Sequence, residues 1–309
     1  MASASSRPTP NAAIPDQAPL RGQTLLDWRR RQLQLGGAAA DLDWLLDLLG
    51  GLPWSSLQHL MLSPERTVRL ETPLEEIETL WRRHLRTCEP LQYLVGRCPW
   101  RDLELTVTPE VLIPRQETEG MVELALALVG PNLQGPALWA DLGTGSGCLA
   151  AALARCWPSS FGLAVDLSEQ ALGVARGNLE RLDLLDQVQL LQGSWWDPLK
   201  PHWGALELVV SNPPYIPEPV WNGLDPQVRD HEPKLALSSG SDGLDAIRLI
   251  AGQASSALAP GGWLLIEHHF DHSPAVQALL RDAGLENLQA HRDLEGKVRF
   301  ASGQRPVPR

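Results

Sequence analysis

Apolar residues recur at helical spacing through the first part of the chain. In TPLEEIETLWRRHLR, Leu74, Ile77, Trp81 and Leu85 fall on one face, as in an amphipathic surface helix. The stretches TLLDWRRRQLQL and DLDWLLDLLG are also typical of helices. Residues 22–90 are therefore expected to form a small helical domain. It carries no cluster of acids, bases or metal ligands, which favours a role in packing or docking.

Short strand-like stretches replace this pattern after residue 90. The runs YLVG, LELTV and EVLIP predict a β-hairpin over residues 91–113 that links two domains. From residue 114 onward, helical stretches alternate with the strand candidates ALWADLG, GLAVDLS, VQLLQG, LELVVS and GWLLIEHH. This alternation predicts an α/β fold over residues 114–309, with a mostly parallel, doubly wound sheet covered by helices on both faces.

Composition and charge narrow the possible partners. The net charge is −11, from 26 basic and 37 acidic residues, which argues against a phosphate backbone as the main partner. No apolar run reaches the length of a membrane span. Residues 1–21 are rich in Ser, Ala and Pro and lack the apolar core of a signal peptide, so we expect a disordered tail; a transit peptide has weak support. The four cysteines lack metal-ligand spacing and suit a reduced, cytoplasmic setting.

The first strand of the α/β region ends in the glycine-rich loop DLGTGSG. Gly143, Gly145 and Gly147 let the backbone turn sharply and approach a ligand, and the loop opens onto a helix N-terminus that favours anionic groups. The dinucleotide fingerprint needs a glycine where Cys148 stands, and the Gly-Lys pair of a Walker loop is absent. The spacing G-x-G-x-G after the acidic Asp141 resembles that of S-adenosylmethionine-binding methyltransferases.

The ends of the next two strands carry further candidate ligands. Asp166 ends the second strand, where a carboxylate can accept from both hydroxyls of a ribose. Trp195 and Trp196 follow the third strand and could stack on an adenine ring. The glycine loop and the acid could alternatively be a tight turn beside a surface aspartate.

The fourth strand, LELVV, runs into the turn SNPPYIP. Because Pro213 and Pro214 have no N–H, the side-chain oxygen of Asn212 and the Pro213 carbonyl are acceptors with no proline donor beside them. Two converging acceptors suit one planar NH2 group, and Tyr215 offers that group an aromatic face. The turn predicts a site that holds an amide or aromatic amine toward a methyl donor on the glycine side. Taken alone, the same turn could simply end a strand.

A nitrogen held in this way is a poor nucleophile because its lone pair is delocalised. Acceptors for its two N–H bonds favour pyramidalisation during attack and stabilise the positive charge that develops. In-line positioning supplies much of the remaining rate. No strong base is needed before attack, because the proton becomes acidic as the methyl group transfers.

The sequence around these motifs resembles one family. PLQYLVG (90–96), VLIPRQETE (111–119), DLGTGSG, SNPPYIP and EPKLALSSGSDGL (232–244) occur in this order. Together they look like the motifs of the peptide chain release factor glutamine methyltransferases, over residues 22–305. The resemblance implies a helical substrate-docking domain, a hairpin linker and a seven-stranded methyltransferase domain. It also implies methyl transfer from S-adenosylmethionine to the glutamine side-chain amide nitrogen in the Gly-Gly-Gln loop of bacterial-type release factors.

The resemblance also assigns roles to residues of this chain. S-adenosylmethionine would be bound by Asp141, Gly143, Thr144, Gly145, Ser146, Gly147, Asp166, Trp195 and Asn212. The substrate glutamine would be bound by Asn212, Pro213, Pro214 and Tyr215, with Arg115 and Glu117 near the mouth of the site. Asn212, Pro213 and Tyr215 would be the catalytic residues. We expect a cytoplasmic monomer that uses no metal and binds neither nucleic acid nor membrane.

Three departures from the family pattern stand out. Ser194 stands where an acid is usual, so adenine contacts would rely on Trp195 and backbone groups. Gln116 replaces a common proline, with little expected effect. His268 and His269 replace the usual ending of the fifth strand, and we expect them to be packing or surface residues rather than catalysts.

Other interpretations stay open on the sequence alone. A nucleic-acid adenine methyltransferase could use the same turn, although the acidic charge and the lack of a basic recognition domain count against it. A glutamine methyltransferase of ribosomal proteins differs after its Pro-Arg pair. A scaffold protein that had lost catalysis would not need the acceptors at Asn212 and Pro213. The segment PRQETE could also do no more than cap the next helix through Thr118 and Glu119.

Overall fold

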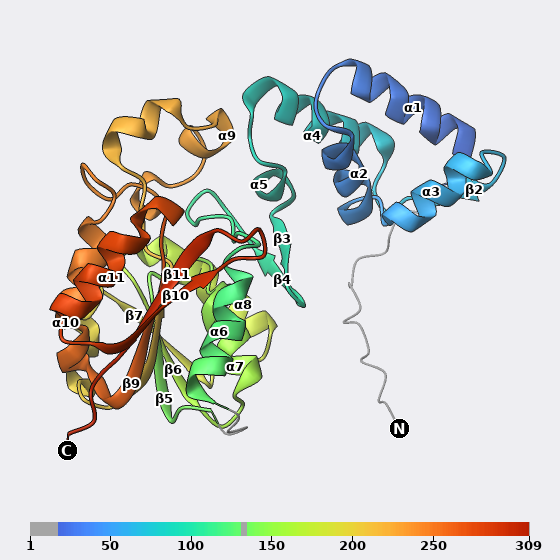
Figure 1. The fold of residues 1–309 in the computed structure, drawn as a ribbon. Coiled ribbons are helices and arrows are strands. Elements are labelled where there is room, and N and C mark those ends of the chain that lie inside the picture. Colours follow the sequence, from blue (N-terminus) through green and yellow to red (C-terminus); the bar gives the residue numbers. More distant parts are fainter. Residues whose placement is uncertain (1–17, 131–134, 309) are drawn as a thin grey trace. The chain divides into compact units, whose positions relative to one another are not determined.

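The structure is a computed structural model that describes residues 18–130 and 135–308. Contacts divide the chain into two compact units, and the boundary along the chain falls between Val95 and Gly96. Most of the tail expected over residues 1–21 lies outside the described residues, and Leu20–Arg21 form a short strand, β1. Each unit is described separately below (Figure 1).

The first unit is helical, as the amphipathic patterns predicted. Its helices are α1 (Gly22–Gln34), α2 (Ala39–Leu48), α3 (Trp54–Leu62), α4 (Leu74–Thr87) and α5 (Leu91–Val95), and β1 pairs with β2 (Thr67–Val68). Ile77 and Trp81 of α4 are fully buried in a core shared with Leu25, Leu45 and Leu57 of the other helices. Burial of these large side chains is the main favourable contribution that such a small helical unit can make to its own stability.

The prediction of a strand at YLVG is wrong, because this run lies in α5. The backbone N–H groups of Tyr93 and Leu94 donate to the Pro90 carbonyl, at 3.1 and 3.2 Å, so a helical turn starts directly after the proline. Leu91 is buried in the helical core. A short, mostly apolar run fits either a strand or one helical face, and here packing decides between them.

A hairpin follows, within the predicted segment but shorter. Strands β3 (Arg97–Trp100) and β4 (Leu103–Thr106) pair antiparallel, whereas EVLIP forms no strand. Trp100, Leu103 and Leu105 are buried in a core of the second unit. The hairpin therefore packs as part of the larger unit.

The second unit is built on a seven-stranded sheet, which confirms the predicted fold class. Its order is β10-β11-β9-β8-β5-β6-β7; β9, β8, β5, β6 and β7 run parallel, and β11 pairs antiparallel with both β9 and β10. The strands are β5 (Leu138–Leu142), β6 (Phe161–Asp166), β7 (Val188–Gln192), β8 (Leu206–Ser211), β9 (Leu258–Glu267), β10 (Glu286–Arg292) and β11 (Val298–Gln304).

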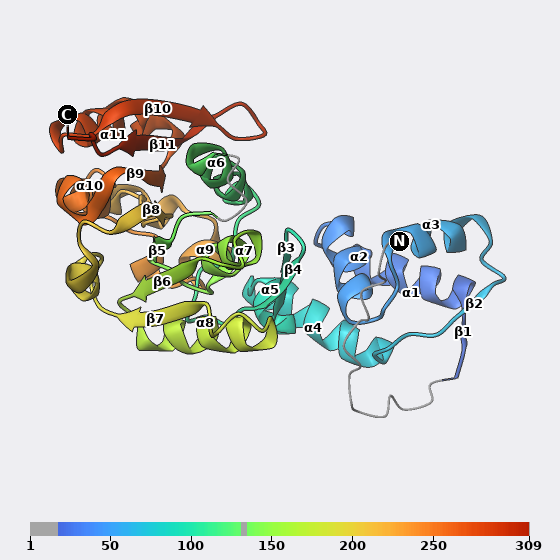
Figure 2. The same ribbon diagram turned by 90° about the horizontal axis from the view of Figure 1, so that it is seen from below.

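Helices cover both faces of this sheet (Figure 2). One face carries α6 (Glu119–Val129), α7 (Cys148–Cys156) and α8 (Glu169–Arg181), and the other carries η1 (Asp197–His202), α10 (Asp245–Ala257) and α11 (Ser273–Asp282). The short elements η2 (Glu218–Gly223), α9 (Pro226–Arg229), η3 (Lys234–Ala236) and η4 (Phe270–His272) lie in connections. Chain order reverses between β5 and β8, and ligands of open α/β sheets bind outside the carboxyl ends of strands at such a point.

Candidate active site

The glycine loop follows β5 and lines a cavity of about 500 Å³. Gly143, Gly145 and Gly147 have φ angles of +77°, +55° and +79°, which side-chain-bearing residues rarely adopt. Gly143 and Gly145 face the cavity. Gly147 precedes α7, and a Cβ there would lie 3.2 Å from the Cβ of Ala175 on α8. Two glycines therefore open the loop to a ligand, and the third lets α7 and α8 pack closely.

Asp166 connects this loop to the end of β6. Its Oδ2 accepts from the Gly145 N–H at 2.8 Å, and its Oδ1 accepts from the Ser168 N–H at 2.9 Å. Burial raises the pKa of Asp166, while the backbone hydrogen bonds oppose that rise. The carboxylate also lines the cavity, and each oxygen keeps a lone pair for a ligand.

The polar residues of the loop lie behind the glycines. Asp141 is buried, and its Oδ2 accepts from the Thr144 hydroxyl at 2.7 Å. Ser146 is also buried. None of the three lines the cavity. Burial raises the pKa of Asp141 to about 7, against the opposing effect of the Thr144 hydrogen bond. The structure therefore supports a role for these residues in holding the loop, and it does not bring them to the cavity surface.

The two tryptophans after β7 have different positions. Trp195 lines the cavity together with Ser194, and its ring would lie 3.3 Å from a Cβ at Gly143. Trp196 is fully buried in the core, and its Nε1 donates to the Ile250 carbonyl at 3.0 Å. The expectation that both indoles could wall an adenine is wrong for Trp196, because the sheet core takes its ring.

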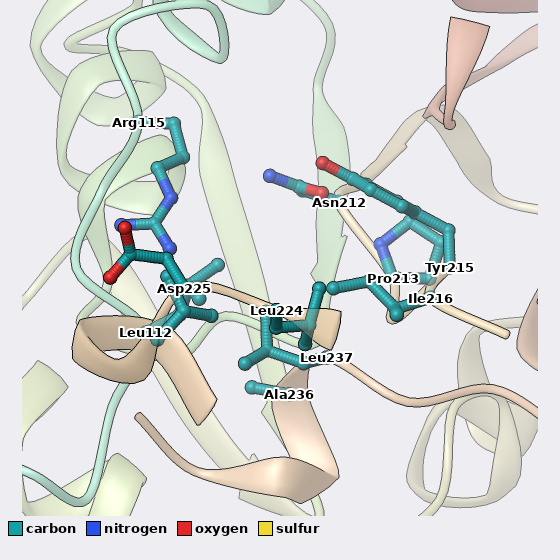
Figure 3. A pocket seen from close by; sticks show the side chains of 11 residues that line it. Leu112, Arg115, Asn212, Pro213, Tyr215, Ile216, Leu224, Asp225, Ala236 and Leu237 are labelled. Atoms are coloured by element: carbon teal, nitrogen blue, oxygen red, sulfur yellow. The ribbon is translucent and has the colours of Figure 1, made fainter. Parts of the chain in front are cut away.

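A second cavity of about 290 Å³ lies beside the NPPY turn (Figure 3). Its lining comprises Leu112, Arg115, Asn212, Pro213, Tyr215, Ile216, Leu224, Asp225, Val228, Ala236 and Leu237. Leu112, Asn212 and Ala236 line both cavities, and Asn212 has the one polar side chain of these three. Pro214 lines the larger cavity. Asn212 thus borders both the cavity on the glycine side and the cavity on the tyrosine side.

A buried polar network holds the NPPY turn from behind. The Asn212 Nδ2 donates to the Thr118 hydroxyl at 3.0 Å, and that hydroxyl donates to Oε2 of Glu267 at 2.7 Å. The Tyr215 hydroxyl lies 3.4 Å from Oε1 of the same carboxylate. Burial raises the pKa of Glu267 to about 7, although the Thr118 hydrogen bond and the nearby Arg299 charge oppose the shift. Thr118 makes no capping hydrogen bond to α6, contrary to the capping interpretation of PRQETE.

Arg115 also meets a partner that sequence reasoning did not assign. Its Nη2 lies 2.6 Å from Oε1 of Glu232, whose side chain is 2% exposed. Oε2 of Glu232 accepts from the Ile113 N–H at 3.3 Å. Glu117 lines neither cavity. A buried carboxylate thus fixes the Arg115 guanidinium at the wall of the smaller cavity.

The residues that sequence reasoning missed carry recognisable signals. Glu267 ends β9, at the same carboxyl edge that drew attention to Asp166 and Asn212. Glu232 opens the EPKLALSSGSDGL segment. His268 is fully buried and bonds the His269 carbonyl through its Nδ1 at 2.8 Å, which agrees with the packing role expected for it.

Across residues 18–130 and 135–308, His, Cys, Asp and Glu side chains nowhere gather in threes as a metal site would require. In the same ranges, every helix is too short or too polar to cross a membrane.

A doubly wound parallel sheet with a glycine loop, a following strand-end acid and a strand-end NPPY turn defines a methyltransferase. The family model described as "Methyltransferase small domain" matches residues 125–219. The release factor glutamine methyltransferase of Prochlorococcus marinus is 50% identical over 284 residues, which are 92% of this chain and 97% of that protein. The chain belongs to the release factor glutamine methyltransferase family.

Other similarities agree with this assignment. The enzyme of the same name from Thermosynechococcus vestitus is 46% identical over 240 residues, 77% of this chain and 82% of that protein. The solved catalytic domain of hMettl16 is 14% identical with a TM-score of 0.52, and the match covers 79% of this chain and 86% of that one. At that identity, the second comparison supports the fold alone.

Proposed function

We propose that this protein transfers a methyl group from S-adenosylmethionine to the side-chain amide nitrogen of the glutamine in the Gly-Gly-Gln loop of bacterial-type release factors. The observation that carries the proposal is the position of Asn212, which lines both cavities. Its Nδ2 donates to the Thr118 hydroxyl, so Oδ1 is the atom left to accept a hydrogen bond from an N–H group of the substrate.

The larger cavity fits an adenosyl group with an amino-acid tail. It combines the Asp166 carboxylate, the Trp195 ring and the backbone of Gly143 and Gly145. Asp166 would hold the ribose hydroxyls, Trp195 the adenine, and the glycine loop the methionine portion. S-adenosylmethionine would supply a methyl group made electrophilic by its sulfonium.

The smaller cavity fits the end of a glutamine side chain. Most of its lining is apolar, which suits the methylene groups, and Tyr215 offers an aromatic face to the planar amide. The Asn212 Oδ1 and the Pro213 carbonyl would each accept one N–H of that amide. Both acceptors stabilise the positive charge that develops on the nitrogen and the proton that then leaves to solvent. Arg115, which lines this cavity, would border its entrance, and Glu117, which lines neither cavity, would lie outside it.

The direct test is a methylation assay with the full-length protein. Methyl-labelled S-adenosylmethionine is mixed with an unmethylated release factor and, in parallel, with the same factor carrying Gln→Ala in the Gly-Gly-Gln loop. We expect label on the first and none on the second. Equal label on both factors, or none on either while S-adenosylmethionine is still bound, would contradict the proposal.

A matched pair of substitutions tests the role of the turn. Asn212→Ala is expected to lower kcat by about 10²-fold or more, by analogy with the loss of one preorganised polar group from an active site. Asn222→Ala changes an exposed asparagine of η2 and should leave kcat within twofold, roughly the effect of a neutral surface change.

A further inference from the structure

We infer that Thr118 and Glu267 are positioning residues that fix which end of the Asn212 amide faces the substrate. This inference rests on the proposed function, because it concerns the orientation of the acceptor that the reaction needs. Neither residue lines either cavity, so both act through Asn212 and Tyr215 and contact no reactant themselves.

The network joins three separate elements at one buried point. Thr118 directly precedes α6, Glu267 ends β9, and Asn212 follows β8. Thr118 is 2% exposed and Glu267 is 1% exposed, so water does not compete for their hydrogen bonds. The distances of 3.0 Å from Asn212 to Thr118 and 2.7 Å from Thr118 to Glu267 are those of well-formed hydrogen bonds.

The polarity of these bonds determines the orientation of the amide. Above its pKa of about 7 the Glu267 carboxylate is ionised and can only accept, so the single hydroxyl proton of Thr118 points to Glu267. The hydroxyl oxygen can then only accept from its other neighbour, which forces Asn212 to present its NH2 end. A flipped amide would place two acceptors, the Thr118 oxygen and Oδ1, against each other. The Asn212 Oδ1 is therefore directed away from Thr118 and is free to accept from the substrate.

The same carboxylate also contacts the other side of the substrate cavity. Oε1 of Glu267 lies 3.4 Å from the Tyr215 hydroxyl, while Oε2 accepts from Thr118. Burial has the largest effect on the Glu267 pKa and disfavours the ionised form, while the charge of Arg299, itself held by Asp293 at 2.5 Å, favours that form. The other charged group near the carboxylate is Glu117, which disfavours ionisation. One buried group thereby orients both the amide and the ring that would enclose the glutamine.

The test compares Thr118→Val with Thr118→Ser in the full-length enzyme. Valine keeps the shape of threonine but has no hydroxyl, whereas serine keeps the hydroxyl. No helix cap is lost in either variant, because Thr118 makes none. Thr118→Val should lower kcat for release factor methylation about tenfold, as expected when a buried hydrogen bond is removed, with KM for the release factor and Kd for S-adenosylmethionine within twofold. Thr118→Ser should keep kcat within about threefold of wild type.

Glu267→Gln supplies the second measurement. A glutamine can donate its NH2 to Thr118, which lets the hydroxyl turn its proton toward Asn212 and weakens the preference for one amide orientation. We expect a decrease in kcat smaller than that of Thr118→Val. The double variant should show less than the product of the two single effects, because Glu267 acts largely through Thr118.

The outcomes separate this inference from the proposed function. Wild-type enzyme that does not label the release factor would overturn the proposed function, and the inference with it. If wild type is active, a Thr118→Val variant with kcat within twofold, or fully multiplicative effects in the double variant, would overturn the inference alone. If Thr118→Val does not fold, Glu267→Gln with kcat within twofold of wild type would do so.

Discussion

Glu267 is a residue whose function is expected to cost stability. Its folded-state pKa of about 7 lies above the ordinary value of 4.5, chiefly because burial disfavours the charged form. The folded protein therefore binds this proton more tightly than the unfolded chain does. The contribution of Glu267 to the free energy of unfolding is fully present below pH 4.5 and is lost as pH rises through 7. Above that pH the carboxylate is charged, buried and costly.

We therefore predict that Glu267→Gln stabilises the fold at pH 8 while it lowers activity. The shift corresponds to an upper value on the order of 3 kcal/mol at pH 8, or several degrees in melting temperature, and the difference from wild type should shrink toward pH 5. Thermal unfolding of both proteins across this range measures it. Glu180→Gln, an exposed change on α8, should show no such trend. A difference that grows as pH falls would contradict the prediction.

At the residue scale, the sequence allowed prediction of the polar groups at strand ends but not of the residues that hydrogen-bond to them. Asp166 and Asn212 could be predicted because the carboxyl edge of a parallel sheet gathers such residues. The bond between Thr118 and Glu267 joins positions 149 residues apart, and local pattern does not determine such a pairing. Trp196 also escaped prediction, because adjacent tryptophans give no sign of which ring enters the core.

At the scale of elements, Gly177 in α8 and Gly147 directly before α7 allow a matched comparison of two glycines. Gly177 lies on the exposed face of α8, away from both ends of the helix, and a Cβ there would meet open space. Gly177→Ala should stabilise the protein by about 0.5–1 kcal/mol, because alanine loses less conformational entropy in a helix. Gly147→Ala should destabilise it by about 1–3 kcal/mol, because its φ of +79° strains any side chain and the new Cβ would meet Ala175.

Chemical denaturation of the two variants beside wild type measures both effects. The Kd for S-adenosylmethionine provides a second measurement, because Gly147 belongs to the loop that borders the larger cavity and Gly177 does not. Gly147→Ala should weaken S-adenosylmethionine binding, and Gly177→Ala should leave its Kd unchanged. Equal effects of the two substitutions on unfolding would show that the turn before α7 tolerates a side chain.

Long, periodic elements were predictable, and short ones were not. From residue 136 to the end of β9 the alternating strands and helices follow the predicted order, because each apolar run is long enough to form a buried strand, whereas β10 and β11 were not among the strand candidates. The run at 91–95 became a helix because Leu91 and Tyr93 both find buried positions there. EVLIP became an irregular connection, with Val111 and Ile113 buried outside any strand. Packing rather than local preference decides such segments.

At the scale of the whole molecule, the two units have separate hydrophobic cores. The core of the first unit is drawn from residues 20–95, and the two cores on either side of the sheet are drawn from residues 100–301. Residues that line the two cavities begin at Glu110. The proposed cofactor and substrate sites thus belong to the larger unit, which leaves the helical unit available for the proposed recognition of the protein substrate.

This division leads to a prediction about the fragment 96–309. Because the fragment keeps the sheet, both of its cores, the hairpin and every residue that lines the cavities, it should fold and bind S-adenosylmethionine with a Kd within about threefold of the full chain. If the helical unit docks the release factor, the fragment should show a KM for that protein raised about tenfold or more, corresponding to about 1.4 kcal/mol of lost binding, with kcat much less affected. Calorimetry and steady-state methylation measure the two quantities separately. Loss of S-adenosylmethionine binding would mean that the larger unit depends on the helical unit to fold. An unchanged KM for the release factor would contradict the docking role of the helical unit. The surface that binds the release factor would then have to lie on the larger unit.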